Sequence, residues 1–348
     1  MSQNTRVIIN NQEIDTWSNV NITYPGNNQI NSCQVSGLPT NLENARFFNT
    51  EIVIYLHYND SVPIFRGIIN EITPSSKGIS VAASDVRFLI ASSDSFPIVV
   101  NEIDNYDGWT VTQFLYDVIN FKLNKNKTYI GLDGLRDSNP TISMTDFRTD
   151  NSSPYEIATQ ILEQVTNDDD VNYPYGYAFD VVDDGIKSNL TIKQIPNIDR
   201  TSQATYNFSR EDGLNSISYK NVNPPNFAVV KGEEDIQVIY EHENRSSGTT
   251  GIDIQGNYTN RAEASYAGLL EVQKQQNWVK DVSISINKAY SIGLYSIVNI
   301  ATLNDNTLGK EINGQHVVQS KTITISQNNV SCVLGLNRPT PKISSYIY

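Results

Sequence analysis

The chain has 348 residues, of which 39% are hydrophobic and 9% aromatic, and 38 acidic against 25 basic residues give a formal net charge of −13. A chain of this length exceeds the size at which one hydrophobic core keeps growing, so we expect at least two domains. The aromatic content argues against an intrinsically disordered chain, and the negative charge argues against binding of nucleic-acid phosphates.

No segment approaches the roughly 20 apolar residues that span a bilayer, and the first residues, "MSQNTRVIINNQE", lack the layout of a signal peptide. We therefore expect no membrane span and folding in a cytoplasm, where disulfides seldom persist. The two cysteines, Cys33 and Cys332, are expected to be buried free thiols. The stretches around them, "NSCQVSGLPT" and "VSCVLGLNRPT", are alike and predict equivalent strands in two related barrels.

Residues 1–95 show short alternating segments broken by turn residues, without a helical period. In "EIVIYLHY" the alternation places Ile52, Ile54 and Leu56 on one face. "VPIFRGIINEIT" and "GISVAASDVRFLI" are expected to pair through "PSSKG", because Pro and Gly favour turns. This region predicts a small antiparallel barrel or sandwich.

Residues 96–206 have a different pattern, with two predicted helices and a hairpin. In "TVTQFLYDVINF" Thr110 and Gln113 form a candidate capping box, and in "NSSPYEIATQILEQV" Ser153 and Glu156 form another. "YAFDVVDDGIKSNLTIKQI" predicts a hairpin that turns at "DDG". This region predicts a compact α+β unit.

Residues 207–348 return to strands and predict a second barrel, with a helix and a loop inserted at about 241–280. "RAEASYAGLLEVQKQQ" predicts the helix, and the Gly-, Ser- and Asn-rich stretch "ENRSSGTTGIDIQGNYTN" predicts an exposed loop. The Asn-Gly at 313–314 predicts a two-residue hairpin turn. The expected fold class is mainly β, with two small antiparallel β-barrels flanking a middle α+β domain.

The usual catalytic and metal-binding patterns do not occur. The three histidines, His57, His242 and His316, stand in no zinc or triad motif, and no phosphate-binding glycine loop is present. We therefore predict no catalytic, cofactor-binding or metal site, and a protein that is not an enzyme.

Two alternatives remain open in the middle region. The carboxylates of Asp168–Asp170, with Asp180, Asp183 and Asp184, are candidates for a cell-wall hydrolase, because glycoside hydrolysis uses paired carboxylates, or for a cation site in the 168–170 loop. The aromatic stretch "YPYGYAF", with Tyr173 and Tyr175, is a candidate glycan- or receptor-binding surface.

The order of the parts resembles phage tail and baseplate hub proteins of the late-control-protein-D-like family. The opening-domain pattern of that family matches a set of residues spread over one strand and the following hairpin. These are Val53, Ile54, Tyr55, Asp60, Phe65, Gly67, Ile68, Glu71, Ile72, Ile79, Ala83, Asp85 and Leu89. The C-terminal region is similar to the second barrel of the same proteins, through "AEASYAGLLEVQ", "HVVQSKTITIS" and "NVSCVLGL"; "IGLYSIVNI" lacks the proline or acidic residue that family members often carry there.

The resemblance implies a homotrimer in which two tail-tube-like barrels per chain form a ring. Such a ring would join the tail tube to the central spike and leave a channel for DNA. Its implied partners are the spike, a tail tube or tube-initiator protein, the tape measure protein and baseplate wedge proteins. The implied location is the tail baseplate of a virion assembled in the host cytoplasm.

Overall fold

The computed structural model describes residues 5–26, 28–40, 50–76, 78–91, 109–117, 130–137, 153–164, 177–195, 206–208, 214–221, 225–233, 235–241, 251–256, 258–274, 279–286, 289–301, 312–327 and 329–337. The helices and strands of these ranges are β1 (Arg6–Ile9), β2 (Gln12–Glu13), β3 (Asn19–Tyr24), β4 (Ser32–Leu38), β5 (Glu51–Tyr55), β6 (Phe65–Ser75), β7 (Gly78–Ser84), α1 (Phe88–Ala91), α3 (Val111–Asp117), β8 (Ile130–Gly131), α4 (Asp133–Asp137), α5 (Pro154–Gln164), β9 (Tyr177–Asp183), β10 (Ser188–Gln194), β11 (Tyr206–Phe208), β12 (Leu214–Asn221), β13 (Phe227–Lys231), β14 (Gln237–Glu241), β15 (Gly251–Gln255), α6 (Arg261–Lys274), β16 (Val279–Ile286), the 3-10 helix η6 (Ala289–Ser291), β17 (Ile297–Ile300), β18 (Gly314–Ser326) and β19 (Asn329–Asn337). In these ranges every helix is too short or too polar to traverse a lipid bilayer.

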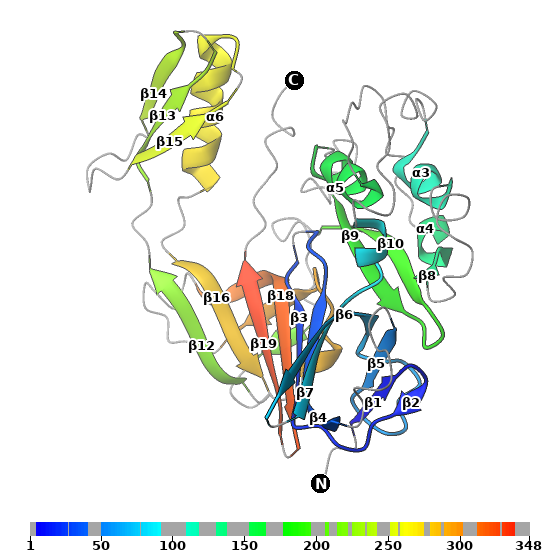
Figure 1. Cartoon of the computed structure of the whole chain (residues 1–348). Coiled ribbons are helices and arrows are strands. Elements are labelled where there is room, and N and C mark those ends of the chain that lie inside the picture. Colours follow the sequence, from blue (N-terminus) through cyan, green and yellow to red (C-terminus); the bar gives the residue numbers. More distant parts are fainter. Residues whose placement is uncertain are drawn as a thin grey trace.

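One large, curled and mostly antiparallel sheet dominates the fold. Its strands follow the order β12-β16-β19-β18-β3-β4-β7-β6-β5-β1-β2, and β17 and β11 branch from β18 to give 13 strands (Figure 1). One hydrophobic core covers a face of this sheet and includes residues from both ends of the chain, from Val7 to Leu336. The mainly-β prediction is confirmed.

The pairing of β3 with β18, which we call the seam, joins the two predicted β domains. The seam extends from Lys321 opposite Tyr24 to Ser326 opposite Asn19. The sequence predicts two separate barrels, whereas the strands of both regions share one sheet and one core. The physical reason is that an edge strand presents unpaired N–H and C=O groups, which a second edge strand satisfies.

The strand triplets β5-β6-β7 and β17-β18-β19 repeat one arrangement. In each, the long central strand pairs first with the short strand before it, then has a β-bulge, and then forms a hairpin with the strand after it. The bulge follows Ile69 in β6 and Val318 in β18. The Ile69 amide donates to the Thr50 carbonyl at 2.9 Å, and the Val318 amide donates to the Ser296 carbonyl at 3.0 Å. Ile69 of β6 therefore occupies the same position in its triplet as Val318 of β18. The residues that follow each bulge also correspond one to one, so Pro74 of β6 corresponds to Ile323 of β18.

This correspondence tests whether Cys33 and Cys332 lie on equivalent strands of the repeat, as the sequence predicts. Cys33 lies in β4 opposite Ala83 of β7, and Cys332 lies in β19 opposite Ile323 of β18. Because β18 corresponds to β6, the counterpart of β19 is β7 and not β4. The prediction of equivalent strands is therefore wrong, although the repeat exists. Both thiols are buried and free, as predicted; three strand spacings through Ile323 and Ile22 separate them by about 14 Å, too far for a disulfide.

The middle unit contains the three-stranded sheet β8-β10-β9 with α5, α3 and α4 nearby (Figure 1). Phe114, Leu162 and Phe179 are buried in a core of its own. The predicted hairpin is confirmed, because β9 and β10 pair from Tyr177–Gln194 to Asp183–Ser188.

Both predicted capping boxes of the middle unit are formed. The Gln113 amide donates to Thr110 Oγ1 at 3.1 Å, and Gln113 Oε1 accepts from the Thr110 amide at 2.9 Å. The Glu156 amide donates to Ser153 Oγ at 3.2 Å, and Glu156 Oε2 accepts from the Ser153 amide at 2.8 Å. Each box satisfies amide donors that the first turn of a helix leaves unpaired.

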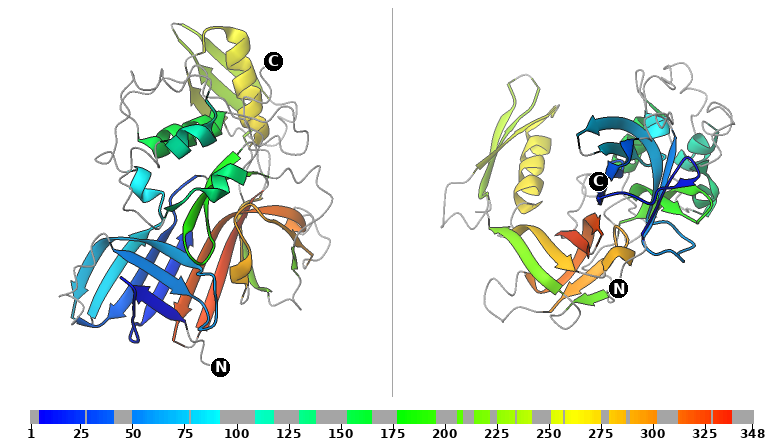
Figure 2. Two further views of the ribbon diagram at one scale, coloured as in Figure 1. Left: turned by 90° about the vertical axis from the view of Figure 1, so that its right-hand side faces the viewer. Right: turned by 60° about the horizontal axis from the view of Figure 1, so that its bottom comes forward.

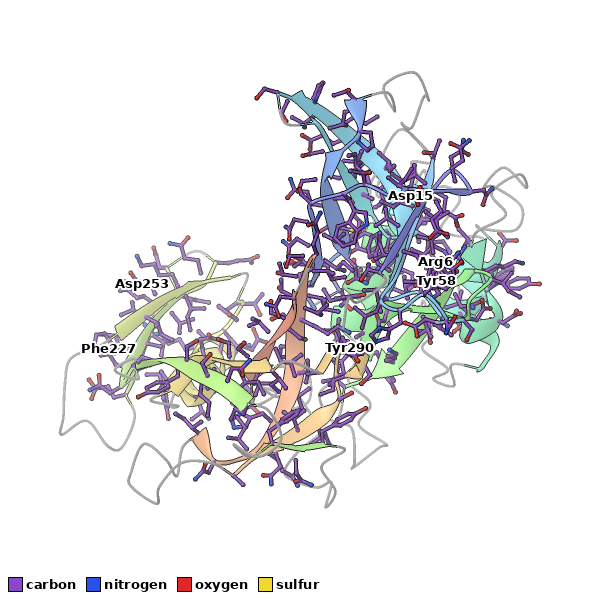
Figure 3. The ribbon with its side chains drawn as sticks, turned by 90° about the horizontal axis from the view of Figure 1, so that it is seen from below. Arg6, Asp15, Tyr58, Phe227, Asp253 and Tyr290 are labelled. Atoms are coloured by element: carbon purple, nitrogen blue, oxygen red, sulfur yellow. The ribbon has the colours of Figure 1, made fainter. Side chains whose placement is uncertain are left out.

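A small separate sheet, β14-β13-β15, packs one face against α6. Figure 3 shows its Phe227 and Asp253 well away from Arg6 of β1 and from Tyr58, which follows β5. The predicted helix is confirmed, but the expected exposed loop is wrong in part, because "GIDIQ" forms β15. The reason is the alternation of Ile252 and Ile254, which pack in the core under α6.

The predicted two-residue turn at Asn313-Gly314 is also wrong. Gly314 begins β18 and pairs with Ile300, the last residue of β17, so the connection between these strands is longer than two residues. Gly314 has φ +119, a backbone conformation that favours glycine, and this requirement explains the residue without a tight hairpin.

Candidate functional site

The face of the large sheet opposite the core is lined by small polar side chains. One row across the sheet contains Ser285, Val333, Thr322, Thr23, Ser32 and Ser84, from β16 to β7. The adjacent row on the opposite face contains Ile286, Cys332, Ile323, Ile22, Cys33 and Ala83, all buried. The period-two alternation of strands therefore separates a polar face from an apolar one across both halves of the sheet.

The polar face is almost free of charge among the described side chains. Between β16 and β7 its described members are hydroxyl, amide or small residues, apart from Val333, which is 40% exposed. The exposed carboxylate of Glu71 lies beyond them on β6. Thr324 Oγ1 donates to Asn21 Oδ1 at 3.2 Å across the seam. Such a surface holds water through hydrogen bonds without presenting an ionic site to a charged ligand.

A buried lysine fastens the core side of the seam. Lys321 Nζ donates to the carbonyls of Ile292 at 2.9 Å and Tyr290 at 3.3 Å, and lies 4.4 Å from the centroid of the Tyr24 ring. The Tyr24 hydroxyl in turn donates to the Ile64 carbonyl. Burial lowers the pKa of Lys321 to about 8. These contacts tie β3 and β18 to segments on both sides of the seam. Figure 2 shows the blue strands of the N-terminal part and the orange and red strands of the C-terminal part side by side in the large sheet.

A buried ion pair attaches the middle unit to the N-terminal half of the large sheet. Arg87 Nη2 lies 2.7 Å from Asp85 Oδ2, and both side chains are at most 3% exposed. Arg87 Nη1 donates to the Phe179 carbonyl of β9 at 2.5 Å, and the Phe179 amide donates to Asn28 Oδ1 at 2.8 Å. Asp85 Oδ2 also accepts from the Asn31 amide at 2.7 Å. The pair is fully hydrogen-bonded, as a buried pair has to be.

Arg66 of β6 forms a second attachment to the same unit. Arg66 Nη1 lies 2.8 Å from Glu51 Oε1, and Arg66 Nη2 donates to the Gly185 carbonyl at 3.0 Å. Arg66 Nε lies 3.7 Å from Asp183 Oδ1. Gly185 has φ +93, and a β-carbon there would lie 2.5 Å from the Ser61 carbonyl oxygen. Glycine at this turn therefore permits the close approach of the β9–β10 hairpin to the large sheet.

The predicted acidic residues that the structure describes have structural partners. Asp180 Oδ2 accepts from Lys193 Nζ at 2.7 Å, and Asp184 Oδ1 accepts from the Ile186 and Lys187 amides. Asp180 and Asp183 are three residues apart in β9 and therefore lie on opposite faces of the strand. The described carboxylates do not form a facing acid–base pair. The residues Asp168–Asp170 lie outside the described part.

Burial raises the pKa of Asp183 to about 7, although the Ser188 hydroxyl and the Arg66 guanidinium favour its charged form. The Ser188 hydroxyl donates to Asp183 Oδ1 at 2.5 Å. A carboxyl with this pKa is a feature of many catalytic acids. Here it lies at the interface of two units, and its pKa follows from that packing.

The other predicted candidates provide no described site. Tyr173, Tyr175 and His242 lie outside the described residues. His57 Nε2 lies 3.5 Å from the Tyr290 hydroxyl, and His316 is buried with Nε2 2.7 Å from the Ile312 carbonyl oxygen.

Residues of the family-like pattern have clear roles in the fold. A β-carbon on Gly67 would lie 2.4 Å from the Ser84 carbonyl oxygen and 2.8 Å from the Phe65 ring. Asp85 is one half of the buried ion pair. This part of the pattern therefore reflects packing rather than chemistry.

Sequence reasoning missed Lys321, Arg66, Arg87 and Asn28, which fasten the units together. Of these, only the Arg87 contact could have been predicted from the sequence, because Arg87 follows its partner Asp85 by two residues in the strand-to-helix turn "SDVRF". The partners of the others are distant in sequence.

Neither a protein-family model nor a curated protein sequence matches the chain. Solved structures show that the fold is shared, over nearly the full chain, with phage tail proteins. The resemblance stated from the sequence is thus confirmed at the level of fold.

One such structure is the tail protein from Neisseria meningitidis MC58, with TM-score 0.61, 11% identity and 99% of both chains covered. Another is the tail protein of prophage MuSo2 from Shewanella oneidensis, with TM-score 0.65, 10% identity and 97% of both chains covered. A third, from E. coli, is described as a type VI secretion system component similar to T4 bacteriophage tail proteins; its TM-score is 0.54 at 7% identity, with 99% of this chain and 76% of that chain covered.

Proposed function

We propose that this chain is a structural hub in the tail of a phage or of a related contractile injection machine. Three copies form a ring that joins the tail tube to the central spike and leaves a channel for DNA. Each copy contributes two tube-like β units, over residues 1–95 and 207–348, and the α+β unit over 96–206 lies between them. The observation that carries this proposal is the polar face, almost free of charge among its described side chains, that continues across the seam.

The chemistry of that face suits a conduit for a polyanion. Duplex DNA carries one negative charge per about 1.7 Å of its axis and is retained by lysine and arginine. The hydroxyl and amide side chains of the row through Thr322 and Thr23 offer no such cation. The net charge of −13 adds a general repulsion. DNA would therefore pass the polar face without being held.

The proposed partners follow from the same position in the tail. They are the spike on one side of the ring, a tail tube or tube-initiator protein on the other, the tape measure protein in the channel and the baseplate wedge proteins outside. The shared fold with tail proteins supports a place in the virion tail. No cofactor is required for this mechanical role.

The two alternatives gain no support from the described residues. Asp180, Asp183 and Asp184 are engaged in contacts that hold the β9–β10 hairpin. A cell-wall hydrolysis assay tests the enzyme alternative, with Asp168→Ala and Asp170→Ala as the variants. Glycan-array binding that disappears in Tyr173→Ala and Tyr175→Ala would favour the receptor-binding alternative.

Negative-stain electron microscopy of the purified chain tests the ring. We expect particles with three-fold symmetry and a central opening. Isolated single chains at every concentration would contradict the proposal.

A further inference from the structure

One face of the small sheet β14-β13-β15 lies outside the hydrophobic cores that the described residues form. The other face packs against α6 through Ala228 and Val230. Successive side chains of a strand point to opposite faces, so the intervening residues belong to the first face, which we call the outer face. Phe227, Val229 and Ile239 form its apolar centre. Val229 lies directly opposite Ile239, which is 59% exposed.

The apolar centre of the outer face extends over all three strands. Ile239 comes from β14, and Phe227 and Val229 come from β13. The Phe227 ring lies across Gly251 of β15, where an added β-carbon would be 2.2 Å from a ring atom. Single exposed apolar side chains are common on protein surfaces, whereas adjacent ones mark a binding surface. The outer face is therefore a candidate docking site.

The charged side chains of the small sheet and its β13–β14 turn are mainly acidic. The described residues 225–233, 235–241 and 251–256 contain four carboxylates and one lysine, all exposed. These are Glu233, Asp235, Glu241, Asp253 and Lys231. Asp253 belongs to the outer face, directly opposite Val229. An occupant that complements this face therefore combines apolar side chains with basic ones.

The segment 338–348, "RPTPKISSYIY", has this composition and lies outside the described residues. It contains the basic residues Arg338 and Lys342, no acidic side chain, and then the apolar stretch "ISSYIY". Its prolines, Pro339 and Pro341, have no N–H to continue the ladder of β19 and favour an extended backbone before them. The sequence therefore favours a chain that leaves the large sheet after β19.

The segment begins close to the point where the chain passes from the large sheet to the small one. β12 and β19 both pair antiparallel with β16, so they run in the same direction. Figure 1 shows both arrowheads directed toward the side where the small sheet lies. Val279 faces Asn221, and Val282 faces Leu336. Two strand spacings and a stagger of two residues therefore separate Asn221 and Asn337 by about 12 Å.

The segment is long enough to reach the outer face. Phe227 follows Asn221 by six residues, which span at most about 21 Å. Phe227 therefore lies within about 33 Å of Asn337. The eleven residues 338–348 span about 36 Å when extended.

We propose that the segment 338–348 binds along the outer face of the small sheet in the same chain. Ile343 and Ile347 are four residues apart, so an extended backbone directs both toward the apolar centre. Lys342 brings a positive charge to Asp253. The segment thereby straps the small sheet to the large one. This inference is independent of the proposed ring, because all its contacts lie within one chain.

Labelling of an Ile239→Cys variant with a maleimide tests the strap. The native Cys33 and Cys332 are buried, so the new thiol is the one that reacts. In the full chain the labelling should be slower by about tenfold or more than in a chain that ends at Asn337, because the thiol reacts only while the segment is off the face. A second variant keeps the full length: Ile343→Ser with Ile347→Ser should label as fast as the shortened chain.

Ile186→Cys is the matched control, because Ile186 is an apolar residue of the β9–β10 turn that is 77% exposed. It should label at the same rate in the full and shortened chains. Equal rates for Ile239→Cys in the two chains would overturn the proposal, and so would slow labelling in the variant with both serines. Protection that weakens on dilution would also overturn it, because the covering segment would then belong to another copy.

Discussion

Replacing Arg87 with alanine should destabilise the protein far more than an equivalent change at the surface. Arg87 is 2% exposed, and its guanidinium donates to Asp85 and to the Phe179 carbonyl. The variant leaves the Asp85 carboxylate buried without its cation. Removing one partner of a buried ion pair costs about 3–5 kcal/mol, a large part of the stability of an ordinary domain.

Arg6→Ala is the matched control, because Arg6 also pairs with a carboxylate, that of Glu13 at 3.2 Å, but at an exposed edge. Its guanidinium lies 5.1 Å from the Tyr58 ring centroid, and Figure 3 shows the two side chains together. Exposed ion pairs and cation–π contacts of this kind contribute roughly 1–2 kcal/mol together.

Urea unfolding, followed by far-ultraviolet circular dichroism, gives the free energy of unfolding of both variants. Arg87→Ala should lose at least twice as much as Arg6→Ala. Adding Asp85→Asn to Arg87→Ala should recover part of the loss, because it removes the unpaired charge. Equal losses in the two single variants would refute the assignment of Arg87 as a buried attachment.

Three further predictions concern the seam, the interface between the middle unit and the large sheet, and the two buried thiols. Gly26→Ala should lower the melting temperature, because Gly26 has φ +71 and a β-carbon there would lie 1.7 Å from the Gln319 carbonyl oxygen; an unchanged melting temperature would argue against this seam packing. Burial raises the pKa of Asp183 from 3.8 to about 7, so the folded state binds its proton more tightly and stability should fall as pH rises through that window. Urea midpoints across this range should therefore vary less in Asp183→Asn, and an undiminished dependence would contradict the assignment. Cys33 and Cys332 are buried and should react with a thiol reagent only after unfolding, since burial raises the pKa of both; rapid labelling of the folded chain would contradict their placement.

Local features of this fold are visible in the sequence, and long-range ones are not. The capping box of Thr110 and Gln113 needs only residues three apart, and the alternation of Ile52 and Ile54 needs only one strand. The seam pairs Ile22 with a residue about 300 positions away, and alternation alone does not select a partner strand. The sequence therefore predicts strands on both sides of the seam but treats them as separate barrels.

The candidate site shows the same limit. The polar face is composed of Ser, Thr, Asn and Gln residues that are individually unremarkable, and they form a row only through the register of several strands. The attachment residues Arg66 and Asn28 contact atoms more than 100 positions away. The sequence predicted no catalytic or metal site and gave the Asp-rich middle region only as an alternative; there the described carboxylates hold a hairpin.

Light scattering of the native chain over a range of concentrations tests the central claim of a three-copy ring most directly. The account predicts a mass three times the 38.9 kDa of one chain, reached as concentration rises. A mass of 38.9 kDa at every concentration, including in the presence of spike and tail tube proteins, would contradict it.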